Sequence, residues 1–328
     1  MKKTACALLL IGLLAACSSS PDAEGDSSFA WVTPTGAPTL AFFDQGDNPN
    51  WLSASNPADV VVPSFAANAY DGIVFDGVSG LTMMAKNKNA AHYKLARWIN
   101  NLGFYLVSTS HAKEDVAEWD SSWTVDAFVK TGNASRCLLS LASTVWNWGD
   151  VSSQVTFEVG LDAVVSNIPS NGYDFYLVAD PAYTNLKAKM GDKLHLIYDL
   201  QEEWGKAHEG AKIPSAALFL NAKGLSERPS AYAKFLKETD ERLETLVDAP
   251  EKAKAALKEY AESDPSHLIN GALPKFGIAA SIVENLPSLQ SHNAFGFVKK
   301  KEAGDAKEIA NSFSRALGGP SFGDELFC

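Results

Sequence analysis

The same order of parts, a short apolar strand, a small-residue loop and the start of a helix, occurs three times in the first half of the chain. The strands are predicted at residues 29–32, 73–75 and 123–130, and each is followed by a loop that contains glycine. Glycine permits backbone angles that end a strand, and proline in the first loop removes a hydrogen-bond donor. Strands that alternate with helices form parallel sheets, so the pattern predicts an α/β fold.

These loops are also the candidate binding sites. A loop that opens a helix leaves backbone N–H groups without partners, and such groups attract anionic or polar parts of a ligand. In open α/β sheets the ligand lies at the carboxyl ends of the strands, where four such loops are expected to converge. An ordinary strand-to-helix turn is the alternative for each loop alone. The candidate ligand-binding residues are Thr33, Thr35, Gly36, Asp76, Gly77, Ser79, Thr131, Gly132, Asn133, Asp180 and Tyr183.

The fourth loop follows an apolar strand and begins with Asp180. Tyr183 is expected to form an aromatic wall of the site. Asp180 is either an acceptor for a ligand amine or a cap of the following helix, and the capping role is favoured. Among the tryptophans, Trp31 is a further candidate wall residue, whereas Trp146 and Trp148 are expected to pack in the core.

The remaining elements continue the α/β pattern. Residues 60–62 are predicted as a strand closed by Pro63, and residues 94–99 as a short edge strand or a helix end. Further strands are expected at 103–110, 155–159, 173–179, 194–198 and 216–221. Helices are expected from Leu81 onward and at 136–148, 161–168, 251–262, 278–283 and 309–317. Another helix follows Pro229, where apolar residues recur at helical spacing: Tyr232, Phe235, Leu236, Leu243 and Leu246.

The N-terminus has the features of an export signal. Two lysines precede an apolar run from Ala5 to Leu14, which is too short to span a bilayer but suits a signal-peptide core. The run ends in Leu-Ala-Ala-Cys17, which resembles the lipobox of bacterial lipoproteins. This resemblance implies a signal peptide at 1–16, acylation of Cys17 and a polar tether at 17–28. The mature protein would be anchored to a membrane by lipid and lie outside the cytoplasm.

Composition and missing motifs limit the possible functions. A formal net charge of −11 argues against binding to nucleic acid. The six histidines show no metal-ligand spacing, and motifs for a nucleophile elbow or a dinucleotide are missing. No metal, cofactor or catalytic residue is therefore predicted. Cys137 and Cys328 can form a disulfide outside the cytoplasm, although a buried free thiol is favoured for Cys137.

Three sequence pieces, in their order along the chain, resemble those of one family. They are Gly72-Ile-Val-Phe-Asp-Gly, Gly172-Tyr-Asp-Phe-Tyr-Leu-Val-Ala-Asp-Pro and Ser226-Glu-Arg-Pro-Ser-Ala-Tyr-Ala-Lys-Phe-Leu. With the lipobox, they are similar to the extracytoplasmic substrate-binding proteins of ABC importers, in the branch that serves sulfonates, nitrate and thiamine precursors. The resemblance covers roughly residues 29–313.

The resemblance implies a type II periplasmic-binding-protein fold, with two α/β lobes joined by two crossing strands. The crossings are expected near 106–110 and 216–221. Lobe one would hold residues 29–111 and 212–328, and lobe two residues 112–211. A small solute, an anion or a heteroaromatic molecule, would close the lobes, and the closed form would dock on an ABC permease without catalysis.

Two other functions remain open at this stage. An enzyme on the same fold, with a thiamine- or menaquinone-pathway type of reaction, would need a histidine–carboxylate pair in the cleft. A sensory lipoprotein would use the fold without transport. Thr35→Pro or Gly77→Val is expected to weaken binding more than stability, because both loops are expected to be exposed.

Overall fold

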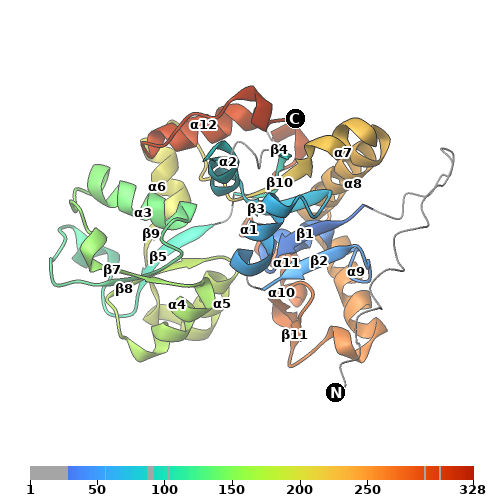
Figure 1. Ribbon diagram of the computed structural model, residues 1–328. Coiled ribbons are helices and arrows are strands. Elements are labelled where there is room, and N and C mark those ends of the chain that lie inside the picture. Colours follow the sequence, from blue (N-terminus) through green and yellow to red (C-terminus); the bar gives the residue numbers. More distant parts are fainter. Residues whose placement is uncertain (1–28, 56, 87–91, 102, 292, 303) are drawn as a thin grey trace, which may run out of the picture.

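A computed structural model describes residues 29–55, 57–86, 92–101, 103–291, 293–302 and 304–328. The chain forms two lobes, each built on a five-stranded mixed sheet with helices on both faces. Figure 1 shows lobe two, in green, beside lobe one, in blue and orange. The predicted signal peptide, the predicted tether and Cys17 lie outside the described residues.

The sheet of lobe one has the strand order β2-β1-β3-β10-β4. The strands β1, β2 and β3 are parallel, whereas β10 runs antiparallel to both β3 and β4. The carboxyl ends of the three parallel strands therefore share one edge. The strands are β1 (Trp31–Pro34), β2 (Trp51–Ala54), β3 (Gly72–Asp76), β4 (Tyr93–Trp98) and β10 (Ala216–Asn221).

The sheet of lobe two has the order β7-β6-β8-β5-β9. Here β6, β7 and β8 are parallel, and β5 is antiparallel to β8 and β9. The strands are β5 (Phe104–Ser108), β6 (Val125–Phe128), β7 (Val155–Glu158), β8 (Phe175–Ala179) and β9 (His195–Asp199). Both sheets follow the predicted α/β pattern, and the predicted strands at 29–32, 73–75, 123–130 and 216–221 are confirmed to within a few residues.

Helices cover both faces of each sheet. In lobe one, α1 (Pro57–Ala67), α2 (Gly77–Lys86) and α12 (Ala306–Ala316) pack on one face. The other face carries α8 (Pro229–Asp248), α9 (Pro250–Ser263), α10 (Ala280–Glu284), α11 (Leu286–Ser291) and the 3-10 helix η1 (Ala37–Phe42). In lobe two, α3 (Asn133–Thr144) and α6 (Leu200–Ala207) lie opposite α4 (Leu161–Asn167) and α5 (Ala182–Met190). The short helix α7 (Ala222–Glu227) precedes α8, and a hairpin of β11 (Ala272–Leu273) and β12 (Ile278–Ala279) precedes α10.

The apolar runs of the strands reflect this two-sided burial. Successive residues of a strand point to opposite faces of the sheet. Trp31 belongs to the core beneath α8, whereas Val32 belongs to the core beneath α1 and α2. A strand buried on both faces needs no polar positions, which explains why these segments are continuous apolar runs.

The chain crosses between the lobes twice, and the two crossing segments lie side by side. The first, residues 99–103, leads from β4 to β5, and the second, residues 208–215, leads from α6 to β10. The Ser215 N–H donates to the Asn100 carbonyl at 3.1 Å, and the Ala216 N–H donates to the Asn100 side chain at 3.0 Å. The first crossing was predicted near residues 106–110, which is wrong, because β5 already pairs with β8 and β9 in the second sheet.

The strand predicted at residues 60–62 is wrong as well, because the segment lies inside α1. Val61 and Phe65 are buried, whereas Pro63 between them is exposed. Buried residues that recur every three or four positions are typical of a helix with one face packed on a sheet. The run of three valines resembled a strand because β-branched residues favour strands on their own.

Several predicted boundaries also shift. The helix expected from Leu81 begins at Gly77, and the helix expected at 136–148 is α3, which begins three residues earlier and ends at Thr144. Residues 94–98 belong to strand β4, whereas residue 99 lies just after it, and residues 278–283 divide into β12 and α10. None of the helices in the described part of the chain combines the length and apolarity needed to cross a membrane.

Candidate functional site

A pocket of about 430 Å³ lies between the lobes. Residues of β5 and α5 line it from lobe two, and residues at and just after α11 line it from lobe one. This volume is within the range of roughly 300–1,000 Å³ that is usual for small-molecule sites. The lining residues are Tyr105, Asp180, Tyr183, Thr184, Lys187, Ala188, Ser288, Leu289 and Ala294.

Two tyrosines form the aromatic wall of this pocket. Tyr105 lies on β5, and Tyr183 lies in the first turn of α5. Their rings stack with centroids 4.2 Å apart and an interplanar angle of 25°. Tyr183 was a predicted wall residue, whereas Tyr105 was hidden inside a predicted strand and carried no separate signal.

Asp180 holds this wall in place from the end of β8. Its carboxylate accepts hydrogen bonds from the Tyr105 hydroxyl at 2.7 Å, and from the Thr184 hydroxyl and N–H at 2.7 and 3.2 Å. The bond to the Thr184 N–H satisfies an open donor in the first turn of α5, as the capping prediction requires. Burial raises the pKa of Asp180, and the hydrogen bonds from Tyr105 and Thr184 oppose that rise.

The positively charged residue that lines the pocket, Lys187, already has its ammonium group bound to backbone carbonyls. The Lys187 ammonium donates to the carbonyls of Gly191 and Leu194, both at 2.9 Å. Gly191 lies eight residues after Tyr183, about 12 Å further along the helix axis. The aliphatic stem of Lys187 therefore lines the pocket while its charge is held near the end of α5.

A second group of predicted residues meets where α2 and α3 begin. Asp76 accepts a hydrogen bond from the Ser79 N–H at 2.8 Å and so caps α2. Burial raises the pKa of Asp76 to about 6, against opposing effects of the Ser79 hydrogen bonds and the Arg136 guanidinium. Within the described part of the chain, the Arg136 side chain makes no hydrogen bond or ion pair. Charge on lobe one thus interacts with charge on lobe two.

Asn133 links α3 to the second crossing segment. Its side-chain amide donates to the Pro214 carbonyl at 2.8 Å, and its Oδ1 is buried with no donor among the described residues. Of its two predicted neighbours, Thr131 is exposed and Gly132 is half-buried. The role of these three residues in ligand binding stays a prediction.

The loop after β1 uses its polar groups within lobe one. The Thr35 N–H donates to the Ala54 carbonyl at 3.0 Å, and the Gly36 N–H to the Phe276 carbonyl at 2.8 Å. The Thr33 hydroxyl accepts from a tryptophan indole at 3.1 Å. These residues do not line the pocket between the lobes, so their predicted ligand contacts have no geometric support here.

Gly77 was expected in an exposed loop, but this position is buried. Its N–H donates to the Ser215 carbonyl at 2.9 Å. A Cβ atom at this position would lie 2.1 Å from the Trp98 ring. Gly77→Val is therefore expected to disturb packing before it affects a ligand.

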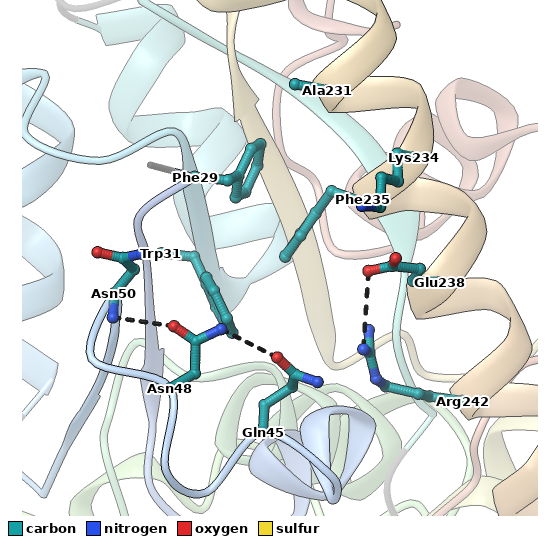
Figure 2. A pocket seen from close by; sticks show the side chains of 10 residues that line it. All are labelled: Phe29, Trp31, Gln45, Asn48, Asn50, Ala231, Lys234, Phe235, Glu238 and Arg242. Carbon is teal, nitrogen blue, oxygen red and sulfur yellow. Dashed lines mark hydrogen bonds and ion pairs between the residues drawn. The ribbon is translucent and has the colours of Figure 1, made fainter. Parts of the chain in front are cut away.

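A smaller cavity of about 130 Å³ lies on lobe one, at the amino ends of β1 and β2 (Figure 2). Trp31 lines this cavity and not the pocket between the lobes, so it is not a wall of the latter. Figure 2 shows the Trp31 ring close to Phe29 and Phe235, with charged residues of α8 along one side of the cavity. Trp146 and Trp148 are buried in lobe two, as predicted, where Trp146 stacks on Tyr198 at 4.1 Å.

The part of the chain that the structure describes offers no support for a metal centre or for a catalytic pair in the pocket. The described residues contain no group of three or more His, Cys, Asp or Glu side chains that could hold a metal ion. The histidine–carboxylate pairs His111–Asp174 and His267–Asp47, at 3.2 and 3.3 Å, do not line the pocket. Both cysteines within the described residues are free, and Cys137 is buried.

Comparison with known proteins identifies the fold. No family model matches the sequence, and no curated protein matches it either. A solved ABC transporter structure from Parabacteroides distasonis has a TM-score of 0.63 at 14% identity, over 92% of this chain and 99% of that chain. The periplasmic aliphatic sulphonate-binding protein SsuA from Escherichia coli gives 0.58 at 12% identity, over 91% of this chain and 96% of that chain.

The description of a third similar structure names its fold. A Candida albicans gene product, described as exhibiting the generic periplasmic binding protein structural fold, gives a TM-score of 0.55 at 10% identity, over 91% of this chain and 92% of that chain. At such low identities the likeness concerns the arrangement of elements. This chain has the two-lobed α/β fold of periplasmic binding proteins.

Proposed function

We propose that this protein is the solute-binding component of an ABC importer, which captures a small solute between its lobes and delivers it to a membrane permease. One observation carries this proposal: the pocket between the lobes takes its walls from both of them. A solute there contacts each lobe, so it favours the arrangement in which both contacts are made. The two adjacent crossing segments are the natural hinge for such a movement.

The comparisons support transport over catalysis. The neighbours named above include an ABC transporter structure and a sulphonate-binding protein. The enzyme alternative called for a histidine–carboxylate pair in the cleft, and the described lining residues do not supply one. Within lobe two, Asp180 and Tyr183 are the predicted residues that the pocket favours as ligand contacts.

Export and anchoring complete the proposal. Cleavage after residue 16 and acylation of Cys17 would place the binding lobes outside the cytoplasm on a tether of residues 17–28. Metabolic labelling with a radioactive fatty acid tests this directly. The wild-type protein should carry label and sediment with membranes, and Cys17→Ser should carry none. Label on the Cys17→Ser variant would contradict the assignment.

Ligand binding is tested with a panel of sulfonates, nitrate, pyrimidines and organic amines, by thermal shift and titration calorimetry. A bound solute stabilises the folded protein by an amount that grows with its concentration above Kd. Ala188→Trp should abolish binding, because Ala188 is exposed and lines the pocket, so the indole fills space without disturbing the core. Lys189→Trp is the matched control, because Lys189 is exposed on the same helix but does not line the pocket.

The two variants separate the outcomes. Binding that is lost in Ala188→Trp and kept in Lys189→Trp supports capture between the lobes. A solute that binds both variants equally well occupies another site and contradicts the proposal. A panel that gives no thermal shift at millimolar concentration also contradicts the proposal. A ligand with a micromolar Kd, which corresponds to a binding free energy of about −8 kcal/mol, would saturate the protein at that concentration.

A further inference from the structure

The charges around the pocket are more informative about the solute than its size. Asp180 and Asp199 flank Tyr105 on either side. Asp180 accepts the Tyr105 hydroxyl hydrogen bond, and Asp199 is directly opposite Tyr105 in the register of β5 and β9. The aromatic wall is thus backed by two carboxyl groups that belong to neighbouring strands.

The two carboxyl groups differ in how many of their oxygens already accept hydrogen bonds. Both oxygens of Asp180 are engaged by Tyr105 and Thr184. Asp199 uses Oδ1 to cap α6, accepting from the Gln201 and Glu202 N–H groups at 2.9 and 3.2 Å. Its other oxygen accepts no hydrogen bond from the described residues.

In addition to the effect of burial, the negative charge of the two carboxylates raises the pKa values of the two tyrosines. Burial raises the pKa of Tyr183, and the carboxylates of Asp180 and Asp199 raise it further. The same two carboxylates act in the same direction on Tyr105. A field that disfavours a phenolate at the pocket wall also disfavours a sulfonate or carboxylate at that place, and it favours a cation.

The positive charges nearby do not cancel this field. The Lys187 ammonium is bound to carbonyls about two helical turns beyond Tyr183. The N-terminus of α5 carries a partial positive charge, which the Asp180 carboxylate offsets where it caps the first turn. Burial raises the pKa of Asp199, the backbone N–H groups of Glu202 and Gln201 oppose that rise, and the effects of the Glu202 carboxylate and the Lys212 ammonium act in opposite directions.

We propose that the solute held in this pocket is an organic cation, with a compact or flat apolar body and an ammonium group or positively charged ring nitrogen placed against Tyr183 and Tyr105. The faces of aromatic rings attract cations through the negative potential of their π electrons. The lobe-one side is mainly apolar, with Leu289 and Ala294, and suits the body of such a solute. This inference rests on the proposed function. The sequence-based expectation was an anion or a heteroaromatic molecule, and the inference departs from the anion.

Two sets of isosteres test the charge of the solute while keeping its shape. The first set is 1-methylnicotinamide, nicotinamide and nicotinate, which carry a positive, zero and negative charge on one ring. The second set is choline, its neutral isostere 3,3-dimethyl-1-butanol and the anion isethionate. Titration calorimetry on the full mature chain should give at least a tenfold preference for the cation over the neutral isostere in at least one set.

Variants assign that preference to the named groups. Asp199→Asn keeps the α6 cap, because asparagine caps as well as aspartate, and should lower the cation-to-neutral affinity ratio about threefold. Tyr183→Leu keeps apolar volume but removes the ring face, and should lower the ratio further than Asp199→Asn does. Tyr183→Phe keeps the ring and should retain the preference. Asp162→Asn, exposed on α4, removes the same charge outside the pocket and should leave the ratio unchanged.

The outcomes distinguish this inference from the function on which it rests. If an anion binds more tightly than its cationic isostere and Ala188→Trp abolishes that binding, the importer proposal stands and the cation inference fails. A ratio that is the same in the wild type, Asp199→Asn and Tyr183→Leu also overturns the inference. If neither the isosteres nor the wider panel binds, the proposed function itself fails.

Discussion

Asp76 is a carboxyl group at the start of α2 whose protonation affects stability. Burial raises its pKa from 3.8 to about 6, so the folded protein holds the proton more tightly than the unfolded chain does. The resulting stabilisation is complete below about pH 4 and is lost as the pH rises through 6. Asp76→Asn cannot ionise and still caps Ser79, so we expect it to be more stable than wild type by ~1–3 kcal/mol at pH 7 and equal to it near pH 4.

Denaturant unfolding of both proteins from pH 4 to pH 8 measures this difference. Asp162→Asn serves as control, since it removes an exposed carboxylate from α4 and should follow the wild-type profile in parallel. The burial argument fails if Asp76→Asn and wild type lose stability by the same amount between pH 4 and pH 7.

Gly77 gives a second prediction at the level of a single residue. A Cβ atom here would lie 2.1 Å from the Trp98 ring and 3.0 Å from the Ala217 Cβ, so a side chain must displace the core. We expect Gly77→Val to lower the free energy of unfolding by about 2–3 kcal/mol, by overpacking. Gly160→Val is the matched control, because a Cβ atom at Gly160 has nothing within 4 Å. Equal melting temperatures for the two variants would contradict this account.

Among the elements, α1 contains a removable defect. Pro63 lies inside this helix and is exposed, so it removes a backbone hydrogen bond and buries little surface in return. We expect Pro63→Ala to raise the free energy of unfolding by about 1–2 kcal/mol, less than the full helix penalty because proline also restricts the unfolded chain. Thermal unfolding measures the gain. Pro250→Ala, at the favourable first position of α9, should give no gain, and an equal gain there would refute the helix argument.

The same elements show what the sequence can predict. The strands β3, β8 and β10 were found because each is a buried apolar run bounded by polar residues. The prediction failed for residues 60–62, where the burial of Val61 and Phe65 depends on the neighbouring sheet and outweighs the strand preference of valine. The start of α2 at Gly77 was missed, because a glycine is needed there to leave room for the Trp98 ring. That contact cannot be seen in the sequence.

The candidate site was predictable in part for a similar reason. Asp180 and Tyr183 follow directly from the end of β8, a feature local in sequence. The opposite wall comes from Leu289 and its neighbours, more than 100 residues later in the chain. Contact between such distant segments depends on how the lobes face each other, and no sequence pattern records that. The same limit applies to the loop after β1, whose N–H groups are used by β2 and Phe276.

The whole molecule has two sheets, and among the described residues one buried apolar cluster continues from lobe one into lobe two, where Trp204 of α6 packs on Phe313 of α12. Asn100 is fully buried and accepts hydrogen bonds from Ser215 through its carbonyl and from Ala216, the first residue of β10, through its side chain, so the two crossings act as one joint. Each lobe keeps its own sheet, and the pocket between them takes its lining from both. Such a construction allows rotation of rigid lobes with changes confined to a few backbone angles.

We therefore expect a solute that binds the pocket to reduce the radius of gyration in solution scattering without changing the secondary structure. The reduction should be absent in Ala188→Trp, whose indole occupies the pocket, and present in Lys189→Trp. The solute can shift the equilibrium only by its difference in affinity for the open and closed arrangements, so a solute that contacts one lobe alone should bind without compaction. A solute that requires Tyr183 and also Leu289 for binding, yet leaves the radius of gyration unchanged, would show that the joint is rigid and that capture occurs without lobe movement.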